Sequence, residues 1–188
     1  MSLFEFTFGL TAVFLGLALA RIVDSLQKLV HAGRRVRWAP EPLMLATIVF
    51  TVIIAVWLNQ WKLRDQTQTA FLTVILTAIE MMAIYFAAAA VLPQVEAADH
   101  TIDLRDHYYE TRTATYGALI AGLLTLIPLV MTLYPEELWT ARRLFFTALF
   151  PGLYLALILV RWRPFHLVVL PAGLIYWAWS QIGRTLGG

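Results

Sequence analysis

The sequence contains no cysteine and little charge. Without cysteine there are no disulfides, no thiolate nucleophiles and no cysteine metal ligands, and the redox compartment is left undetermined. Asp, Glu, Lys and Arg together make up 14% of the 188 residues, whereas soluble domains average about a quarter. The scarcity of charge argues against a single water-facing domain.

Signatures of catalysis are also scarce. The only serines are Ser2, Ser25 and Ser180, and no nucleophile-elbow serine, glycine-rich phosphate loop or His-Glu-x-x-His zinc motif occurs. His166 is the only histidine near an apolar run, so two axial haem ligands inside a bilayer are not present. We therefore expect a non-enzymatic protein with no cofactor. The net charge of +2 gives no indication of a nucleic-acid partner, and none is expected.

Apolar residues are abundant instead. They make up 60% of the chain, and the mean hydropathy is +0.72, which is typical of integral membrane proteins. Helices rise about 1.5 Å per residue, so runs of 16 or more residues approach the roughly 30 Å of a bilayer core. We predict one membrane domain over residues 1–188, an all-α polytopic transmembrane helical bundle. Its six spans are residues 6–26, 43–58, 69–92, 114–133, 144–160 and 165–180.

The first apolar run needs a separate test, because Ala18-Leu19-Ala20 resembles the cleavage site of a secretory signal peptide. Signal peptides begin with Lys or Arg, whereas the only early charge here is Glu5. The helical pattern also continues beyond Ala20. We expect the run to remain as a permanent span.

Lys and Arg are distributed unevenly between the two sides of the predicted bundle. Short cytoplasmic loops carry an excess of these residues, which places the predicted polar loop 94–113 in the cytoplasm and both termini on the non-cytoplasmic side. A bacterial inner membrane is compatible with this arrangement. The nine cations on the cytoplasmic side are Arg21, Lys28, Arg34, Arg35, Arg37, Arg105, Arg112, Arg161 and Arg163, against Lys62, Arg64, Arg142, Arg143 and Arg184 on the other.

Glu80 stands near the middle of the third span. A charged residue at the bilayer centre costs about 2.5–3.5 kcal/mol on insertion scales, so this carboxyl must be protonated, paired, or face protein or water. Thr73 and Thr77 share its helix face. One interpretation is that this face packs against other helices, with Glu80 a neutral hydrogen-bonded acid. The other is that Glu80, Thr77 and Thr73 border a pathway for protons or cations.

Arg21 and Asp24 lie three residues apart on the first span. The simplest account is a local ion pair that reaches the cytoplasmic headgroups. Alternatively, Arg21 turns inward as the counter-ion of Glu80. Both residues belong to the predicted ion or proton pathway.

Two weaker site predictions concern the cytoplasmic side. If the loop 94–113 is helical, four side chains share a face that suits a divalent metal, although solvated acidic helices give the same spacing. A cationic cluster at the start of span six could hold an anionic lipid headgroup, with general headgroup anchoring as the alternative. The metal candidates are His100, Asp103, His107 and Glu110, and the headgroup candidates are Arg161, Arg163 and His166.

Two functional hypotheses follow. The first is a small proton- or cation-linked transporter or channel centred on Glu80, which is consistent with prolines inside the last three predicted spans. The second is a non-catalytic membrane module for assembly, sensing or scaffolding, which packs with lipids, with a partner membrane protein or with copies of itself. Small residues along the first span favour such helix contacts.

Overall fold

The computed structural model describes residues 3–60, 71–95, 101–133 and 141–181, with side chains described for residues 7–60, 71–95, 101–128 and 148–178. Within these residues the chain forms six α-helices and two very short strands. The helices are α1 (Leu3–Ala32), α2 (Pro40–Gln60), α3 (Phe71–Val91), α4 (Leu104–Leu133), α5 (Ala141–Leu159) and α6 (Arg163–Gln181). The all-α architecture is as predicted.

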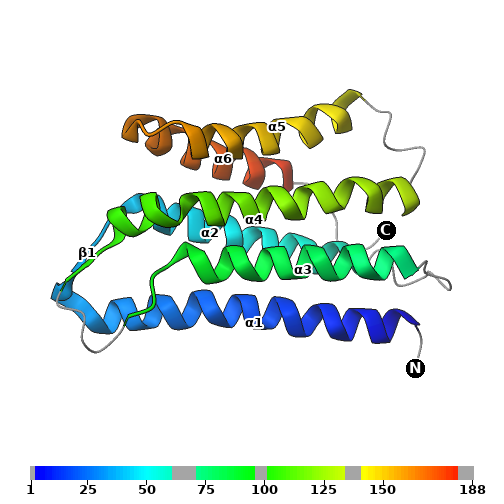
Figure 1. Cartoon of the computed structure of the whole chain (residues 1–188), viewed down its shortest axis with the longest axis horizontal. Coiled ribbons are helices and arrows are strands. Elements are labelled where there is room, and N and C mark those ends of the chain that lie inside the picture. Colours follow the sequence, from blue (N-terminus) through cyan, green and yellow to red (C-terminus); the bar gives the residue numbers. More distant parts are fainter. Residues whose placement is uncertain (1–2, 61–70, 96–100, 134–140, 182–188) are drawn as a thin grey trace.

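The helices lie alongside one another and run alternately in opposite directions (Figure 1). One layer contains α1, α3, α4 and α5 in that order, and α2 and α6 lie behind it. Helix α3 packs against α1, α2 and α4, while α5 packs on α4 and α6 on α2. Helix α3 is therefore the centre of the bundle, and α5 and α6 form its margin.

Three of the helices are long and apolar enough to cross a membrane: residues Thr7–Arg35, which cover most of α1, together with α2 and α3. Each of the predicted spans lies within or closely overlaps a helix, because continuous apolar runs determine where these helices form. The loop predicted over 94–113 is different. Helix α4 begins at Leu104, so half of that segment is helical and continuous with the predicted fourth span.

A short two-stranded sheet closes one end of the bundle. Strand β1 (Val36–Arg37) pairs in parallel with β2 (Ile102–Asp103), so the α1–α2 connection is joined to the segment before α4. Gly33 makes the preceding turn possible, because its φ of 54° lies in the left-handed region that glycine adopts without strain. This turn follows directly on the end of α1.

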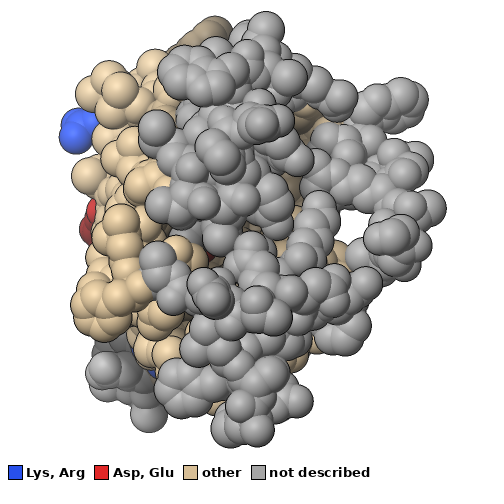
Figure 2. All heavy atoms as spheres, turned by 90° about the vertical axis from the view of Figure 1, so that its right-hand side faces the viewer, with Lys and Arg blue, Asp and Glu red and all other residues tan. Residues whose placement is uncertain are grey.

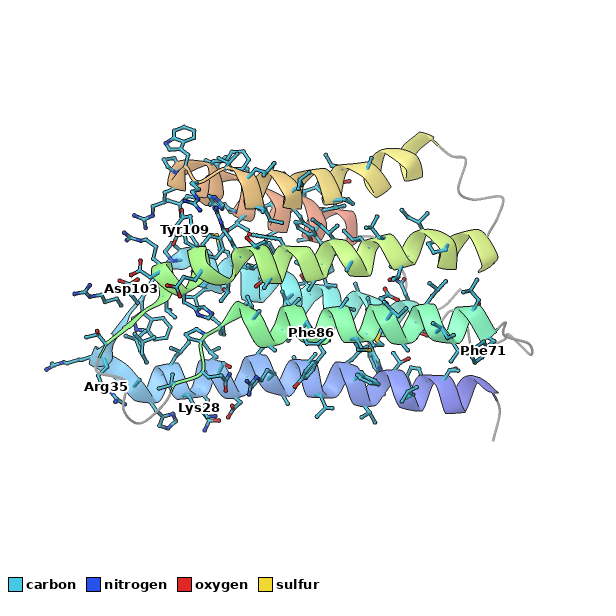
Figure 3. All side chains as sticks on the ribbon, in the orientation of Figure 1. Lys28, Arg35, Phe71, Phe86, Asp103 and Tyr109 are labelled. Carbon is cyan, nitrogen blue, oxygen red and sulfur yellow. The ribbon has the colours of Figure 1, made fainter. Side chains whose placement is uncertain are left out.

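Among the described side chains, charged groups gather at the end that carries the sheet. Figure 3 shows Lys28, Arg35 and Asp103 there, whereas Phe71 lies at the opposite end. Figure 2 looks onto that opposite end, where the described atoms in view are almost all neither acidic nor basic. We call the first the sheet end of the bundle. Its exposed cations are Lys28, Arg34, Arg35, Arg37, Arg105 and Arg161.

Candidate functional site

Glu80 lies in the interior of the bundle, with 4% of its surface exposed. Thr73 on the same helix is buried and Thr77 is half-buried, so the predicted polar face of α3 does point inward. Within the described part of the chain, Glu80 forms no hydrogen bond or ion pair. It is a buried carboxyl in the helix that packs against α1, α2 and α4.

One contact shows which residue of α4 lies at the depth of Glu80. Helix α4 runs antiparallel to α3 (Figure 1), and a Cβ added at Gly122 would lie 3.7 Å from the Cβ of Ala83. This places Thr125 near the level of Glu80. The Thr125 hydroxyl group donates to the Gly122 carbonyl of its own helix at 2.7 Å. On α1, Thr11 is a buried polar residue, and the Ser25 hydroxyl accepts from Gln94 Nε2 at 2.7 Å.

Within the described residues Arg21 forms no ion pair with Glu80 or with Asp24. Asp24 instead binds Lys28 Nζ at 2.8 Å, four residues along the helix. Arg21 Nε is buried and has no hydrogen-bond partner within the described residues.

The small residues of α1 and the threonines of α2 do not face the bundle interior as the polar face of α3 does. Gly9, Gly16 and Ala20 on α1 are exposed. On α2 the hydroxyl groups of Thr47 and Thr51 donate to the carbonyls of Leu43 and Ile48, which satisfies them within their own helix. Of these three sets of residues, the polar face of α3 with Thr73 and Glu80 is the one that lies in the interior.

A second buried polar group lies at the sheet end, where α2, α4 and α6 meet. Its carboxylate is Glu41, which is fully buried in the first turn of α2 and accepts a hydrogen bond from Arg163 Nε at 2.7 Å. A negative charge at a helix N-terminus is favourable, and the bond to Glu41 raises the pKa of Arg163. We call this group the sheet-end cluster: Glu41, Tyr108, Tyr109, Arg112, Tyr116, Arg163 and His166.

Much of the sheet-end cluster converges on the turn between α5 and α6. The carbonyl of Val160 accepts from Arg112 Nη1 at 3.1 Å and from His166 Nε2 at 2.8 Å. The guanidinium of Arg112 also lies over the ring of Tyr109, 5.4 Å from its centre. Within the described residues, Glu41 Oε2, Arg112 Nε and the Tyr109 hydroxyl are buried without a hydrogen-bond partner. The cluster fixes the α5–α6 turn against α4.

Sequence reasoning missed most of this cluster. Of its members only Arg163 and His166 were site candidates, for lipid headgroups. His166 is fully buried, and Arg163 is bound to Glu41, so within the described residues Arg161 is the one member that is exposed and forms no ion pair. The one available signal was the position of Glu41 as an acid directly before the apolar run of α2.

The described members of the predicted metal site have other roles. Asp103 Oδ1 accepts from the backbone N–H groups of Arg105 and Asp106, which makes it the N-cap of α4, and these bonds, Asp106 first, lower its pKa. His107 Nε2 donates to the Ala90 carbonyl at 3.1 Å, and burial lowers its pKa. Glu110 is exposed, and His100 lies outside the described residues. Within the described residues no three such side chains are placed to hold a metal ion.

Comparison with known proteins adds no assignment. The chain matches no protein-family model, no curated protein and no solved structure. Its function must therefore be argued from two features of its own structure, Glu80 in the middle of the bundle and the sheet-end cluster.

Proposed function

We propose that this chain is a six-span membrane protein that moves protons or cations, with Glu80 as its intramembrane acid. The observation that carries the proposal is a buried carboxyl near the middle of α3 that forms no ion pair within the described residues. Such a group is costly in a bilayer and marks ion or proton pathways in many membrane proteins. Thr77 lies one turn away on α3, and Thr125 on α4 lies near the same depth.

The six-span topology rests on length, direction and charge. Helices α4, α5 and α6 contain 30, 19 and 19 residues and alternate in direction with α1, α2 and α3. The exposed cations of the sheet end, with exposed Trp38 and Trp162 beside them, favour a cytoplasmic location for that end. Both termini then lie on the opposite side of a cell membrane, such as a bacterial inner membrane. Tags at either terminus that are reached only from outside intact cells would support this topology.

The function is tested by reconstituting the purified chain in liposomes and following the decay of a pH or cation gradient. We expect wild-type protein to accelerate the decay and Glu80→Gln to abolish most of the acceleration. Glu110→Gln is the matched control, because Glu110 is an exposed carboxylate outside the bundle interior, and it should behave as wild type. Equal flux for wild type and Glu80→Gln would overturn the proposal.

A second function, a membrane module that binds another helix, is favoured by one specific observation. Gly9, Gly16 and Ala20 are exposed on α1, and nothing lies within 4 Å of a Cβ added at either glycine. Gly16 and Ala20 are four residues apart, the spacing at which small residues let two membrane helices approach closely. The outer face of α1 is therefore suited to contact a second membrane helix.

This second function predicts an oligomer or a stoichiometric partner after purification in mild detergent. Gly16→Leu should dissociate the complex, whereas Val13→Leu, a substitution on the same exposed face, should leave it intact. Recovery of wild-type protein as a bare monomer would count against the module and would leave the transport proposal standing.

A further inference from the structure

Three fully buried side chains of the sheet-end cluster form a continuous hydrogen-bonded chain. The hydroxyl groups of Tyr116 and Tyr108 lie 2.9 Å apart, and the Tyr108 hydroxyl lies 2.7 Å from His166 Nδ1. None of the three residues is more than 1% exposed. The chain therefore links two turns of α4 to the start of α6 within the protein interior.

The direction of these hydrogen bonds follows from one contact. A carbonyl oxygen only accepts, so His166 Nε2 must carry a proton and donate to Val160 at 2.8 Å. In neutral His166 the other nitrogen, Nδ1, then accepts from Tyr108. The Tyr108 oxygen is in turn free to accept from Tyr116. The two bonds between Tyr116, Tyr108 and His166 therefore point toward the histidine, as a supply of protons from the bundle interior to His166 requires.

We propose that Tyr116, Tyr108 and His166 form a proton relay between the bundle interior and the sheet end. A proton delivered to the Tyr116 oxygen by a hydronium ion or a carboxylic acid forms a new O–H bond there. The original Tyr116 proton moves to Tyr108, and the original Tyr108 proton moves to His166 Nδ1. Each tyrosine ends with one hydroxyl hydrogen, and His166 becomes an imidazolium ion.

Protonation of His166 reverses the direction of the hydrogen bonds between His166, Tyr108 and Tyr116. With both ring nitrogens of His166 donating, Tyr108 must accept from Nδ1 and donate to Tyr116. Protonation of the histidine thus changes the hydrogen bonding of a tyrosine that is 50 residues away in the chain.

The charged and titratable groups around His166 come from every helix packed on it. Glu41 is contributed by α2, Arg112 and the ring of Tyr109 by α4, and Arg163 by α6 itself. The negative charge of Glu41 stabilises the imidazolium form of His166, whereas the positive charge of Arg112 destabilises it. At the other end of the relay, the ring of Tyr154 on α5 stacks on Tyr116 with centres 5.6 Å apart.

The inference rests on the proposed function for the source of the protons, and it places the relay on the sheet-end side of Glu80, nine residues of α4 or about 13 Å from the level of that carboxyl. The hydrogen bonds that define the relay do not depend on the transport function. Its test must therefore observe the relay directly as well as through flux.

The direct test is infrared difference spectroscopy of the full chain in lipid nanodiscs between a pH at which His166 is neutral and one at which it is protonated. Ring-labelled tyrosine in the wild-type chain identifies the tyrosine bands without any substitution. We expect a histidine band and a tyrosine C–O–H band that appear with the same pH dependence. Both should vanish in His166→Gln, and the tyrosine band should change in Tyr108→Phe and Tyr116→Phe but not in Tyr85→Phe on α3. A wild-type spectrum without a tyrosine change linked to His166 would overturn the relay.

Flux separates the two proposals. Tyr116→Phe removes one hydroxyl group and should lower proton flux at least tenfold. If Glu80→Gln stops flux while Tyr116→Phe alters neither flux nor spectrum, the relay is wrong and the transport function stands. If the coupled bands appear while Glu80→Gln leaves flux unchanged, the relay stands and the transport function is wrong.

Discussion

Glu41 and Arg163, 122 residues apart in the chain, are joined by a 2.7 Å hydrogen-bonded ion pair at the sheet end of the bundle. Glu41 is fully buried, whereas the Arg163 side chain is 41% exposed. The pair connects the first turn of α2 to the first turn of α6. It therefore ties the marginal α5–α6 hairpin to the centre of the bundle.

Removal of Arg163 should destabilise the protein, because it leaves the Glu41 carboxylate buried without its cation. We expect Arg163→Ala to lower the Tm in detergent by several degrees. Glu41→Gln combined with Arg163→Ala should restore part of the loss, since a neutral amide is less costly to bury than a carboxylate. A double variant no more stable than Arg163→Ala would show that the pair does not act through charge.

Asp103 should make the stability of α4 depend on pH. Its pKa is lowered in the folded state by bonds from the N–H groups of Asp106 and Arg105, so its stabilising effect is present above the unfolded pKa of about 3.9. The effect is lost as the pH falls through the lower folded value. Thermal melts should show wild type more stable than Asp103→Ala at neutral pH and the difference shrinking below about pH 4. A difference that is constant with pH would contradict the capping role.

Close packing of α3 on α4 should limit the size of residue 122. The nearest atom to an added Cβ at Gly122 is 3.7 Å away on Ala83, which is ordinary contact. Gly122→Ala should therefore be tolerated, whereas Gly122→Leu should cost about 1–3 kcal/mol through overpacking. Reversible unfolding in mixed micelles measures both values, and equal stability of the two variants would argue against the observed helix contact.

Arg21 and Glu80 should behave as independent sites, because no ion pair or hydrogen bond joins them within the described residues. The free-energy changes of Arg21→Gln and Glu80→Gln should add in the double variant to within about 0.5 kcal/mol. A larger coupling energy would restore the counter-ion hypothesis.

The predictable part of this structure is the part controlled by local hydrophobicity. Continuous apolar runs predicted α2 and α3 to within three residues at each end, whereas α1 ends six residues beyond the predicted span. The inward face of α3 followed from Glu80 itself. A polar residue in an apolar helix is not always a sign of an inward face, because a threonine can bond its own backbone, as Thr47 and Thr51 do.

The sheet-end cluster could not be predicted for a different reason. Tyr108 and His166 are 58 residues apart, and only the packing of α6 beside α4 brings them together. Tyr108 also stood in a segment with the composition of a surface loop, where tyrosine ordinarily lies at the membrane interface. No local pattern marks its burial.

The central claim is that Glu80 exchanges its proton with water through the bundle. Infrared spectroscopy of the reconstituted protein tests it by following the carboxyl C=O band that is absent in Glu80→Gln after transfer from H₂O to D₂O. Glu41→Gln serves as the control, because it removes the band of Glu41, the other buried carboxyl among the described residues. We predict that the Glu80 band shifts within minutes and that its intensity depends on pH. A band that stays unshifted for hours and does not titrate would mean a sealed interior, and would contradict the account.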